Sequence, residues 1–447
     1  MRLAILGGGG FRVPLVYGAL LRDHHRPRID EVALYDVDPS RLDAIRRVLE
    51  LMAAGDDAAP AISVTTDLDE ALTGSDFVFS AIRVGGLEGR RTDEHVALRL
   101  GVLGQETTGP GGLAFGLRTV PVAVRVAERV AAVAPQARVI NFTNPAGMIT
   151  EAMQRVLGDQ VVGICDSPIA LARRAARALG LDPTVTFADY VGLNHLGWLR
   201  RLLHRGVDLL PRLLADESAL RRVEEARLFG VDWVRALGAL PNEYLYYFYF
   251  ARDAVAAIQH NGATRGEFLL KQQAAFYEAV AARPDAALEE WQRVRRERDE
   301  TYMKDVHTES ETAGRDEADL EGGGYEGVAL AYMAAVMRGE QTSMILDVRN
   351  GWSVPGLPPE AVVEVTCHVN GTGARPLATE PLEGHQLGLL QQMKAVEQLT
   401  IEAALNHDAS IALKAFALHP LVDSVSTARK LLQGYVEASP DVAAVLH

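Results

Sequence analysis

The chain is poor in cysteine, with only Cys165 and Cys367 in 447 residues. Two cysteines cannot supply the disulfide framework that stabilises small secreted domains. An apolar run also begins almost directly after Met1, which leaves no room for a signal peptide. These features predict a cytoplasmic protein, and each cysteine needs an explanation of its own.

The sequence also lacks long runs of basic or of apolar residues. It has 45 Lys and Arg against 59 Asp and Glu, and its net charge of −14 argues against nucleic acid as a partner. The apolar runs are far too short to cross a bilayer, so no membrane association is expected. A length of 447 residues predicts two or more domains and a large buried core.

Glycine is abundant at the start of the chain, in the stretch LGGGGFRVP. The apolar run 3–6 predicts a buried strand, and apolar residues return at helical spacing from Val13. Gly7, Gly8, Gly9 and Gly10 therefore join a strand to a helix. Glycines in such a turn permit positive φ and let backbone N–H groups approach a ligand, while the helix N-terminus favours an anion.

These glycines match the dinucleotide-binding pattern G-x-G-x-x-G only in part. Gly7 and Gly9 fill the first two places, but Arg12 stands in the third. A second predicted strand, 31–35, ends at Asp36, about 20 residues or a little more beyond the last glycine, where a carboxylate accepts hydrogen bonds from an adenosine ribose. Loop, helix and Asp36 together predict dinucleotide binding.

Strand and helix patterns alternate through about residue 190, with buried strands beginning at residues 77, 137 and 160. This rhythm predicts an α/β protein with an N-terminal Rossmann-like, doubly wound parallel sheet. We expect an NAD-binding domain at 1–190 and a mixed α+β domain for metal, substrate and oligomerisation at 191–447. In the second domain, helices are expected at 264–282 and 386–418, strands within 343–370, and a mobile surface loop at 295–327.

Cys165 and Asp166 end an apolar strand, and His195 follows another apolar stretch in GLNHLGW. A buried cysteine is often only a small hydrophobic residue. A thiolate and an imidazole on neighbouring strand ends can instead bind a borderline divalent ion, with substrate oxygens completing its coordination. Two protein ligands hold a metal weakly, which suits a catalytic site.

The stretch PNEYLYYFYF contains four tyrosines, most of which are expected to pack into the core. One of them could act as a general base beside a metal. Arg90 and Arg265 are ordinary surface arginines by default, and either could clamp an anionic group of a substrate.

Taken together, these stretches resemble the NAD- and metal-dependent glycosidases of glycoside hydrolase family four. The ordered matches are LGGGG, LYDVD, GLEGRRTDE, GQETTGPGG, NFTNPAG, GICDSP, GLNHLGW, NEYLYY and LTIEAAL with LHPL. They cover nearly the whole chain and look most similar to the 6-phospho-β-glucosidases and 6-phospho-α-glucosidases of that family.

The resemblance implies roles for individual residues. It makes Cys165 and His195 the ligands of a metal, usually Mn²⁺, and Tyr244 the catalytic base. Glu106 matches an acidic position that tunes this tyrosine. The implied substrate-binding residues are Arg90, Asn144 and Arg265, and the implied cofactor-binding residues are Gly7, Gly8, Gly9, Gly10, Phe11, Asp36, Arg83 and Asn144. Gly10 and Phe11 depart from the hydroxyl residues that are common in the family.

The implied activity is hydrolysis of 6-phospho-β-glucosides by oxidation at C3, removal of the C2 proton and elimination. Asp166 matches the proton donor of the α-specific enzymes, whereas GLEGR, GQETTG and NFTNPAG look more like the β branch, so a 6-phospho-α-glucosidase is the alternative. An NAD-dependent hydroxy-acid dehydrogenase and a silent NAD sensor are weaker interpretations. The partner is a small sugar phosphate, and a homodimer or homotetramer is expected.

Overall fold

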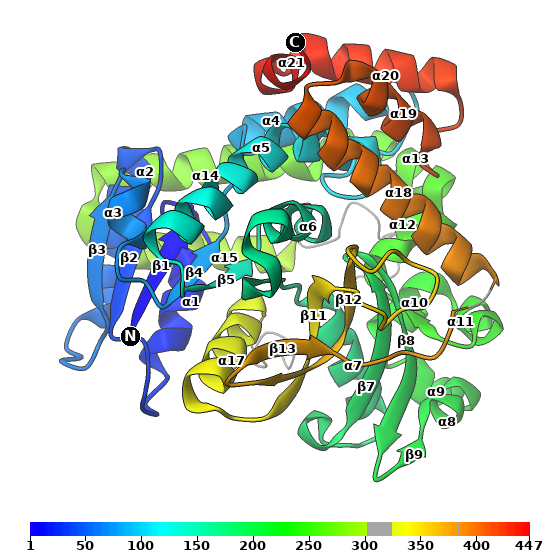
Figure 1. The fold of residues 1–447 in the computed structure, drawn as a ribbon, viewed down its shortest axis with the longest axis horizontal. Coiled ribbons are helices and arrows are strands. Elements are labelled where there is room, and N and C mark those ends of the chain that lie inside the picture. Colours follow the sequence, from blue (N-terminus) through cyan, green and yellow to red (C-terminus); the bar gives the residue numbers. More distant parts are fainter. Residues whose placement is uncertain (302–323, 383) are drawn as a thin grey trace.

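The computed structural model describes residues 1–301, 324–382 and 384–447. Within these residues, 13 strands form one mixed sheet, and helices lie on both of its faces (Figure 1). The strand order is β10-β8-β7-β12-β11-β6-β5-β4-β1-β2-β3, with β9 paired to β8 and β13 paired to β12. None of the helices in this part of the chain is long and apolar enough to span a bilayer.

Six parallel strands form one half of this sheet. They are β1 (Arg2–Leu6), β2 (Glu31–Tyr35), β3 (Ala61–Thr65), β4 (Phe77–Ser80), β5 (Arg138–Asn141) and β6 (Val161–Gly163). Their order, 3-2-1-4-5-6, is that of dinucleotide-binding Rossmann folds, and the chain switches direction between β1 and β4. The predicted Rossmann-like sheet is therefore confirmed.

Both faces of the parallel half are buried, which explains its continuous apolar strands. In β1, Leu3 and Ile5 join one core cluster with residues of the first two helices, whereas Ala4 and Leu6 join a second cluster on the opposite face. All four are fully buried. The connecting helices are α1 (Val13–Leu21), α2 (Pro39–Ala53), α3 (Leu68–Leu72), α4 (Gly86–Leu98), α5 (Pro110–Val133), α6 (Ala146–Leu157) and α7 (Ser167–Ala178).

Antiparallel strands continue the sheet beyond β6. They are β7 (Phe187–Leu193), β8 (Leu196–His204), β9 (Val207–Asp208), β10 (Leu240–Pro241), β11 (Thr342–Arg349), β12 (Val362–Asn370) and β13 (Gly373–Pro376). The junction is the antiparallel pairing of Asp347 in β11 with Gly163 in β6. Residue 190 lies inside β7, so the two domains that the sequence predicts share one sheet, and their division stays a prediction.

The helices of the C-terminal half lie around both parts of the sheet. They are α8 (Leu210–Ala215), α9 (Glu217–Leu220), α10 (Glu224–Phe229), α11 (Val231–Leu237), α12 (Tyr246–Tyr249), α13 (Ala251–Asn261), α14 (Arg265–Ala282), α15 (Ala287–Glu300), α17 (Tyr325–Arg338), α18 (Gly384–Asn406), α19 (Ala409–Leu418), α20 (Val425–Ala438) and α21 (Pro440–Leu446). The expected helix at 264–282 is α14. The one expected at 386–418 is two helices, because Asp408 caps α19 by accepting the N–H groups of Ser410 and Ile411.

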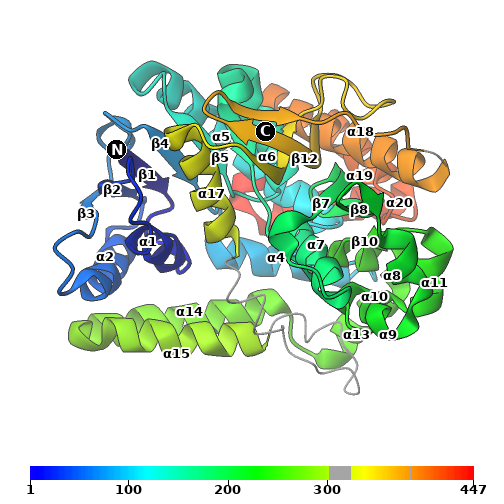
Figure 2. The same ribbon diagram turned by 90° about the horizontal axis from the view of Figure 1, so that it is seen from below.

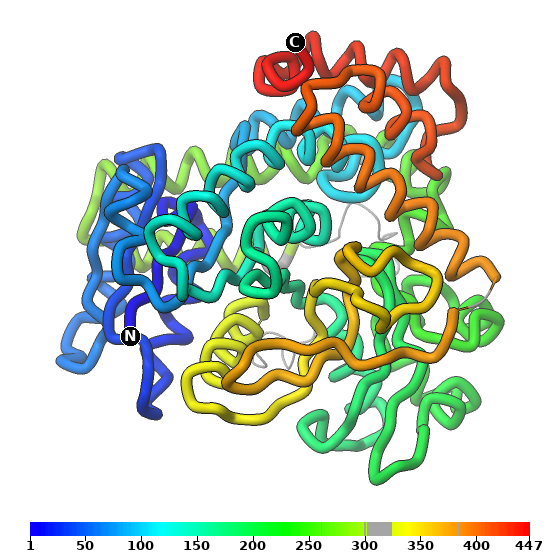
Figure 3. Tube along the Cα trace, viewed as in Figure 1, coloured from blue at the N-terminus to red at the C-terminus, as the bar shows by residue number. Residues whose placement is uncertain are grey.

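Two groups of these helices pack against the N-terminal half. Figure 2 shows α14 and α15 lying side by side, and they contact α2 and α4. The tube in Figure 3 shows the red and orange C-terminal segment beside the cyan one, where α18 and α21 contact α5 and α20 contacts α4. Elements far apart in the sequence therefore build one body around the sheet.

The segment 295–327, which the sequence predicts as a surface loop, is partly helical. Helix α15 continues through Glu300 and α17 begins at Tyr325, while residues 302–323 lie outside the described part. The prediction of a loop is therefore wrong at both ends of the segment.

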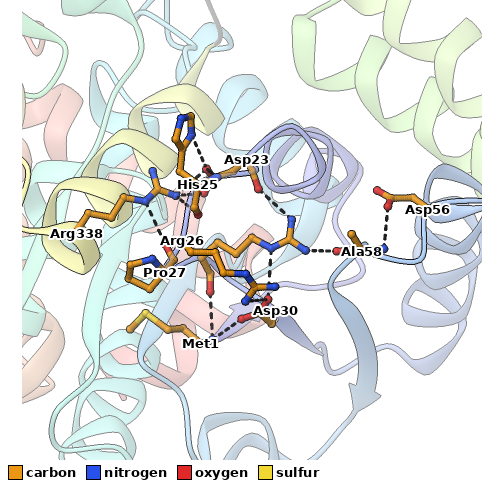
Figure 4. Close-up of polar contacts among 10 residues, drawn as sticks. Met1, Asp23, His25, Arg26, Pro27, Asp30, Asp56, Ala58 and Arg338 are labelled. Carbon is orange, nitrogen blue, oxygen red and sulfur yellow. Dashed lines mark hydrogen bonds and ion pairs between the residues drawn. The ribbon is translucent and has the colours of Figure 1, made fainter.

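Helix α17 is fastened to the end of α1 by Arg338, which donates to both carboxylate oxygens of Asp23 and to the carbonyls of His25 and Pro27 (Figure 4).

A buried ion cluster connects α18 with α6 and β12. Lys394, which is 1% exposed, donates to Glu151 at 2.8 Å and to Glu397 at 2.5 Å. Glu151 also accepts the backbone N–H of Val362 at 2.9 Å. Removing one partner of such a buried pair leaves the other charge uncompensated.

We therefore expect Lys394→Met to lower the free energy of unfolding by about 3–5 kcal/mol, measured by urea denaturation. The matched control is Lys430→Met, at an exposed lysine of α20, which should change stability by less than about 0.5 kcal/mol. Equal effects of the two substitutions would contradict a structural role for the buried cluster.

Candidate active site

A cavity of about 1160 Å³ lies at the carboxyl ends of the parallel strands. All of the site residues that the sequence predicts line it except Gly8 and Gly9. The structure thus brings together Gly7, Gly10, Phe11, Asp36, Arg83, Arg90, Glu106, Asn144, Cys165, Asp166, His195, Tyr244 and Arg265. This is the edge at which open α/β sheets bind their ligands.

The glycine loop is as compact as its composition predicts. Gly7 has φ +82°, and a Cβ there would lie 2.6 Å from the carbonyl oxygen of Ala81. Gly8 and Gly9 serve packing, since a Cβ on either would lie 2.7 Å from the Cβ of Leu34 or Arg41. Only glycine fits at all three positions. The sequence led us to expect Gly8 and Gly9 at the cofactor site, but neither lines the cavity.

Side chains from three C-terminal helices fasten the carbonyl groups of this loop. Tyr277 of α14 donates to the Gly9 carbonyl at 2.6 Å, Trp291 of α15 to that of Phe11 at 2.9 Å, and Tyr325 of α17 to that of Arg12 at 2.8 Å. The Phe11 ring is buried and lies 5.1 Å from the ring of Phe276. Phe11, at a position where the resembling family commonly has a hydroxyl residue, therefore anchors the helices to the loop.

Asp36 stands at the end of β2 with both carboxylate oxygens engaged. One accepts the N–H of Gly9 at 3.0 Å, and the other accepts the N–H of Asp38 at 3.2 Å. These bonds hold the carboxylate at the cavity wall beside the glycine loop. This wall fits a dinucleotide, because Gly7 and Gly10 line the cavity and an acidic side chain stands at the end of the second strand.

Cys165 and His195 reach the cavity from the two halves of the sheet. Cys165 follows β6 and is 5% exposed, and burial together with the carboxylates of Glu364 and Asp166 raises the pKa of its thiol. His195 lies at the tip of the β7–β8 hairpin with φ 62°. Burial lowers its pKa to about 4, although the nearby carboxylates act to raise it. A neutral imidazole and a thiol among carboxylates suit a divalent cation.

The described residues contain no group of three or more His, Cys, Asp or Glu side chains placed to hold a metal ion. A cation between Cys165 and His195 would therefore need oxygen ligands from elsewhere. Asp166 and Asn144 line the same cavity, and the Asp166 side chain makes no capping bond to α7. This donor set fits an open, catalytic site rather than a closed, structural one.

Tyr244 and Tyr247 of the tyrosine-rich stretch line the cavity, and Tyr244 contacts His195. Its ring stacks on the imidazole of His195, with ring centroids 3.7 Å apart and an angle of 8° between the planes. Asn242 accepts the backbone N–H of Tyr244 at 3.0 Å and so fixes the start of this short helical turn. By contrast, Tyr249 accepts from the indole of Trp198 at 3.1 Å, and burial raises its pKa to about 12.

Arginines surround Glu106, which lines the same cavity. Its carboxylate lies 2.9 Å from Arg83 and 3.0 Å from Arg90. Although burial opposes ionisation, Arg90 and Arg83 lower the pKa of Glu106 to about 2. Arg90 is only 7% exposed and is not the surface arginine of the default interpretation.

Sequence reasoning missed further arginines that line the cavity, among them Arg12 and Arg298. The Arg12 guanidinium lies over the rings of Phe142 and Tyr325, at 5.6 and 5.1 Å from their centroids. Burial and the neighbouring charges of Arg12 and Arg265 lower the pKa of Arg298. The sequence could have pointed to Arg12, because it stands in the third glycine place of the dinucleotide-binding pattern. It gave no such sign for Arg298, which lies in the segment expected to be a loop.

Two sequence models of protein families match the chain. The one described as family 4 glycosyl hydrolase matches residues 2–181, and the one described as the C-terminal domain of that family matches residues 190–422. A probable 6-phospho-beta-glucosidase of Bacillus subtilis is 28% identical over 98% of this chain and 96% of the relative. A 6-phospho-alpha-glucosidase of Lacticaseibacillus paracasei is 30% identical over 98% of this chain and 97% of the relative.

Solved structures with the same fold include the 6-phospho-beta glucosidase from Thermotoga maritima with manganese, NAD⁺ and glucose-6-phosphate. It is similar to this chain with a TM-score of 0.80 and 26% sequence identity, over 98% of each chain. The similarity therefore extends through both halves of the sheet.

The ion pairs of Glu106 give a prediction about acid stability. Because its pKa of about 2 in the fold lies below the ordinary 4.5, these pairs stabilise the fold above about pH 4.5 and cease to do so as the pH falls toward 2. Over that range, the wild type should lose about 3 kcal/mol of unfolding free energy that Glu106→Gln does not lose.

Urea denaturation across this pH range measures the difference. The control is Glu88→Gln, which removes a 60% exposed carboxylate paired with Arg91 and should follow the wild-type profile. Parallel profiles for wild type and Glu106→Gln would refute the strong stabilisation of the Glu106 carboxylate.

Proposed function

Because the chain belongs to family 4 of the glycosyl hydrolases, as its motifs predict, we propose that it hydrolyses 6-phospho-β-glucosides with NAD⁺ and a divalent metal such as Mn²⁺. The observation that carries the proposal is the stacking of Tyr244 on His195, in one cavity with Cys165 and the glycine loop. Relatives of both anomeric specificities support the broader class of 6-phospho-glucosidase.

The residues that would hold the two cofactors line one cavity. The glycine loop, Asp36, Arg83 and Asn144 are proposed to hold NAD⁺, and Cys165 and His195 are proposed to hold the metal. When bound, NAD⁺ supplies a hydride acceptor and the metal supplies a Lewis acid that acidifies the proton next to an oxidised carbon.

Tyr244 is proposed to remove the proton from C2 of the sugar. It lies in the short helical turn Glu243–Leu245 that Asn242 caps, and its ring lies flat on the imidazole of a proposed metal ligand. A cation at that imidazole would stabilise the phenolate and so lower the pKa of the base. Asp166 is the proposed donor to the leaving oxygen, since its carboxyl group lines the cavity next to Cys165.

The arginines around Glu106, together with Arg265, are proposed to bind the 6-phosphate. Arg90 and Arg265 are the recognition residues, and charge-assisted bonds from guanidinium groups suit a dianionic phosphate. Glu106 connects Arg83 with Arg90 and so orients both. A carboxylate stabilised this strongly is a poor base, which leaves proton removal to Tyr244.

A 6-phospho-α-glucosidase is the second candidate, and Asp166 is the specific observation in its favour. Aspartate at this place resembles the α branch, and a 30% identical relative carries that name. The motifs GLEGR, GQETTG and NFTNPAG favour the β branch. A homodimer or homotetramer stays our prediction for the assembly.

The first test compares 4-nitrophenyl β- and α-glucoside 6-phosphates, each with and without NAD⁺ and Mn²⁺. We expect the β anomer to be cleaved faster, and only when both cofactors are present. Unphosphorylated glucosides are the control, and they should react far more slowly because the arginines lose their charged partner. Faster cleavage of the α anomer would select the second candidate, and cleavage without NAD⁺ would overturn the proposed chemistry.

The second test follows the C2 proton. Turnover in D₂O should place deuterium at C2 of the released sugar phosphate, whereas displacement between paired carboxylates never breaks that bond. Tyr244→Phe should lower kcat by about a hundredfold or more, because it removes the proposed base. Tyr246→Phe is the matched control, and activity near that of the wild type is expected. Cleavage without deuterium at C2 would exclude the elimination mechanism.

A further inference from the structure

The loop between α4 and α5 contacts His195 through a residue to which no role has yet been given. The hydroxyl oxygen of Thr107 lies 2.9 Å from Nδ1 of His195. We propose that Thr107 and Gln105 fix the tautomer of His195, so that Nδ1 carries the proton and Nε2 presents its lone pair to the metal. The inference rests on the proposed function, in which His195 is a metal ligand.

The direction of each hydrogen bond follows from counting protons. The side-chain oxygen of Gln105 accepts the backbone N–H groups of Thr107 at 2.7 Å and of Thr108 at 2.5 Å. Backbone amides only donate, so the Gln105 atom at this position is the oxygen and not the nitrogen. The Thr107 hydroxyl lies 3.1 Å from that same oxygen and donates its proton there.

A hydroxyl group has one proton, so this bond uses the proton of Thr107. Toward His195, the Thr107 oxygen can then only accept, and Nδ1 must be the donor. In a neutral imidazole, which a metal ligand must be, a proton on Nδ1 leaves Nε2 bare. Gln105 and Thr107 therefore determine which nitrogen is available to a cation.

Further features hold the imidazole in this orientation. The backbone of His195 has φ 62° at the tip of the β7–β8 hairpin, and its neighbour Asn194 is held by donating to Glu364 at 3.1 Å. The ring of Tyr244 covers one face of the imidazole. The Thr107 bond adds a contact that distinguishes the two ring nitrogens.

The loop thus orients two groups of cavity residues, the arginines and His195. Glu106 engages Arg83 and Arg90, while Thr107, its neighbour in the chain, engages His195. Thr107 is a positioning residue, because it acts through His195 and not on the substrate. Partners of this kind usually change metal affinity by about 10–100-fold when they are removed.

The test reads the tautomer directly, in metal-free, full-length protein labelled with ¹⁵N-histidine. The His195 signals are assigned by their loss in His195→Gln. Wild type and Thr107→Ser should show the proton on Nδ1, because both have the hydroxyl. Thr107→Val is nearly isosteric but lacks it, and a mixture of tautomers or the Nε2-protonated form is expected. Gln105→Leu should shift the tautomer toward Nε2–H, because the freed hydroxyl can donate to Nδ1.

Calorimetric titration with Mn²⁺ is the second readout. Thr107→Val should bind about 10–100-fold more weakly than wild type, with Thr107→Ser close to wild type. Unchanged tautomer and affinity in Thr107→Val, or a wild type protonated on Nε2, would overturn the inference. If wild type binds no Mn²⁺, the metal role in the proposed function fails, whereas the histidine spectrum still decides whether Thr107 and Gln105 set the tautomer.

Discussion

The junction between β6 and β11 is the constraint on which the arrangement of the site depends. Gly163 and Asp347 pair there across the two halves of the sheet. A Cβ on Gly163 would lie 2.5 Å from the Thr150 hydroxyl and 2.7 Å from the Cβ of Asp347, so the strands can approach only with glycine at this place. Cys165 follows two residues later, and the antiparallel strands beyond the junction end in the hairpin that carries His195.

Cationic and acidic side chains both line the cavity. Arg83 and Arg90 pair with the carboxylate of Glu106, and Arg90 also pairs with Glu94. Next to His195, Asn194 donates to Glu364. Burial and the charge of Asp166 raise the pKa of Glu364 to about 8 despite the bonds it accepts from Asn194 and Tyr190. Such a lining suits a substrate whose anionic group meets the arginines and whose hydroxyl groups face a cation.

The sequence predicts those parts of the structure that local pattern controls. Apolar runs ending in glycine, Asp36 or Cys165 mark buried parallel strands, because both faces of such strands need apolar side chains. His195 and Tyr244 were found through motifs, and their proposed roles come from family resemblance rather than from spacing. Arg298 and Thr107 could not be found in this way, since their neighbours in space lie on elements far away in the chain. The burial of Arg90 likewise depends on Glu94 and Glu106, a packing relation that no local pattern encodes.

The fastening of the glycine loop by Tyr277, Trp291 and Tyr325 bears on how modular the chain is. A Rossmann half is often regarded as a transferable unit, but here the donors to its loop carbonyls come from α14, α15 and α17. A fragment cut near residue 190 would lose all three donors and expose the ring of Phe11. By linkage, a nucleotide that binds the loop would also stabilise those three helices, so that cofactor occupancy would strengthen the whole chain against unfolding.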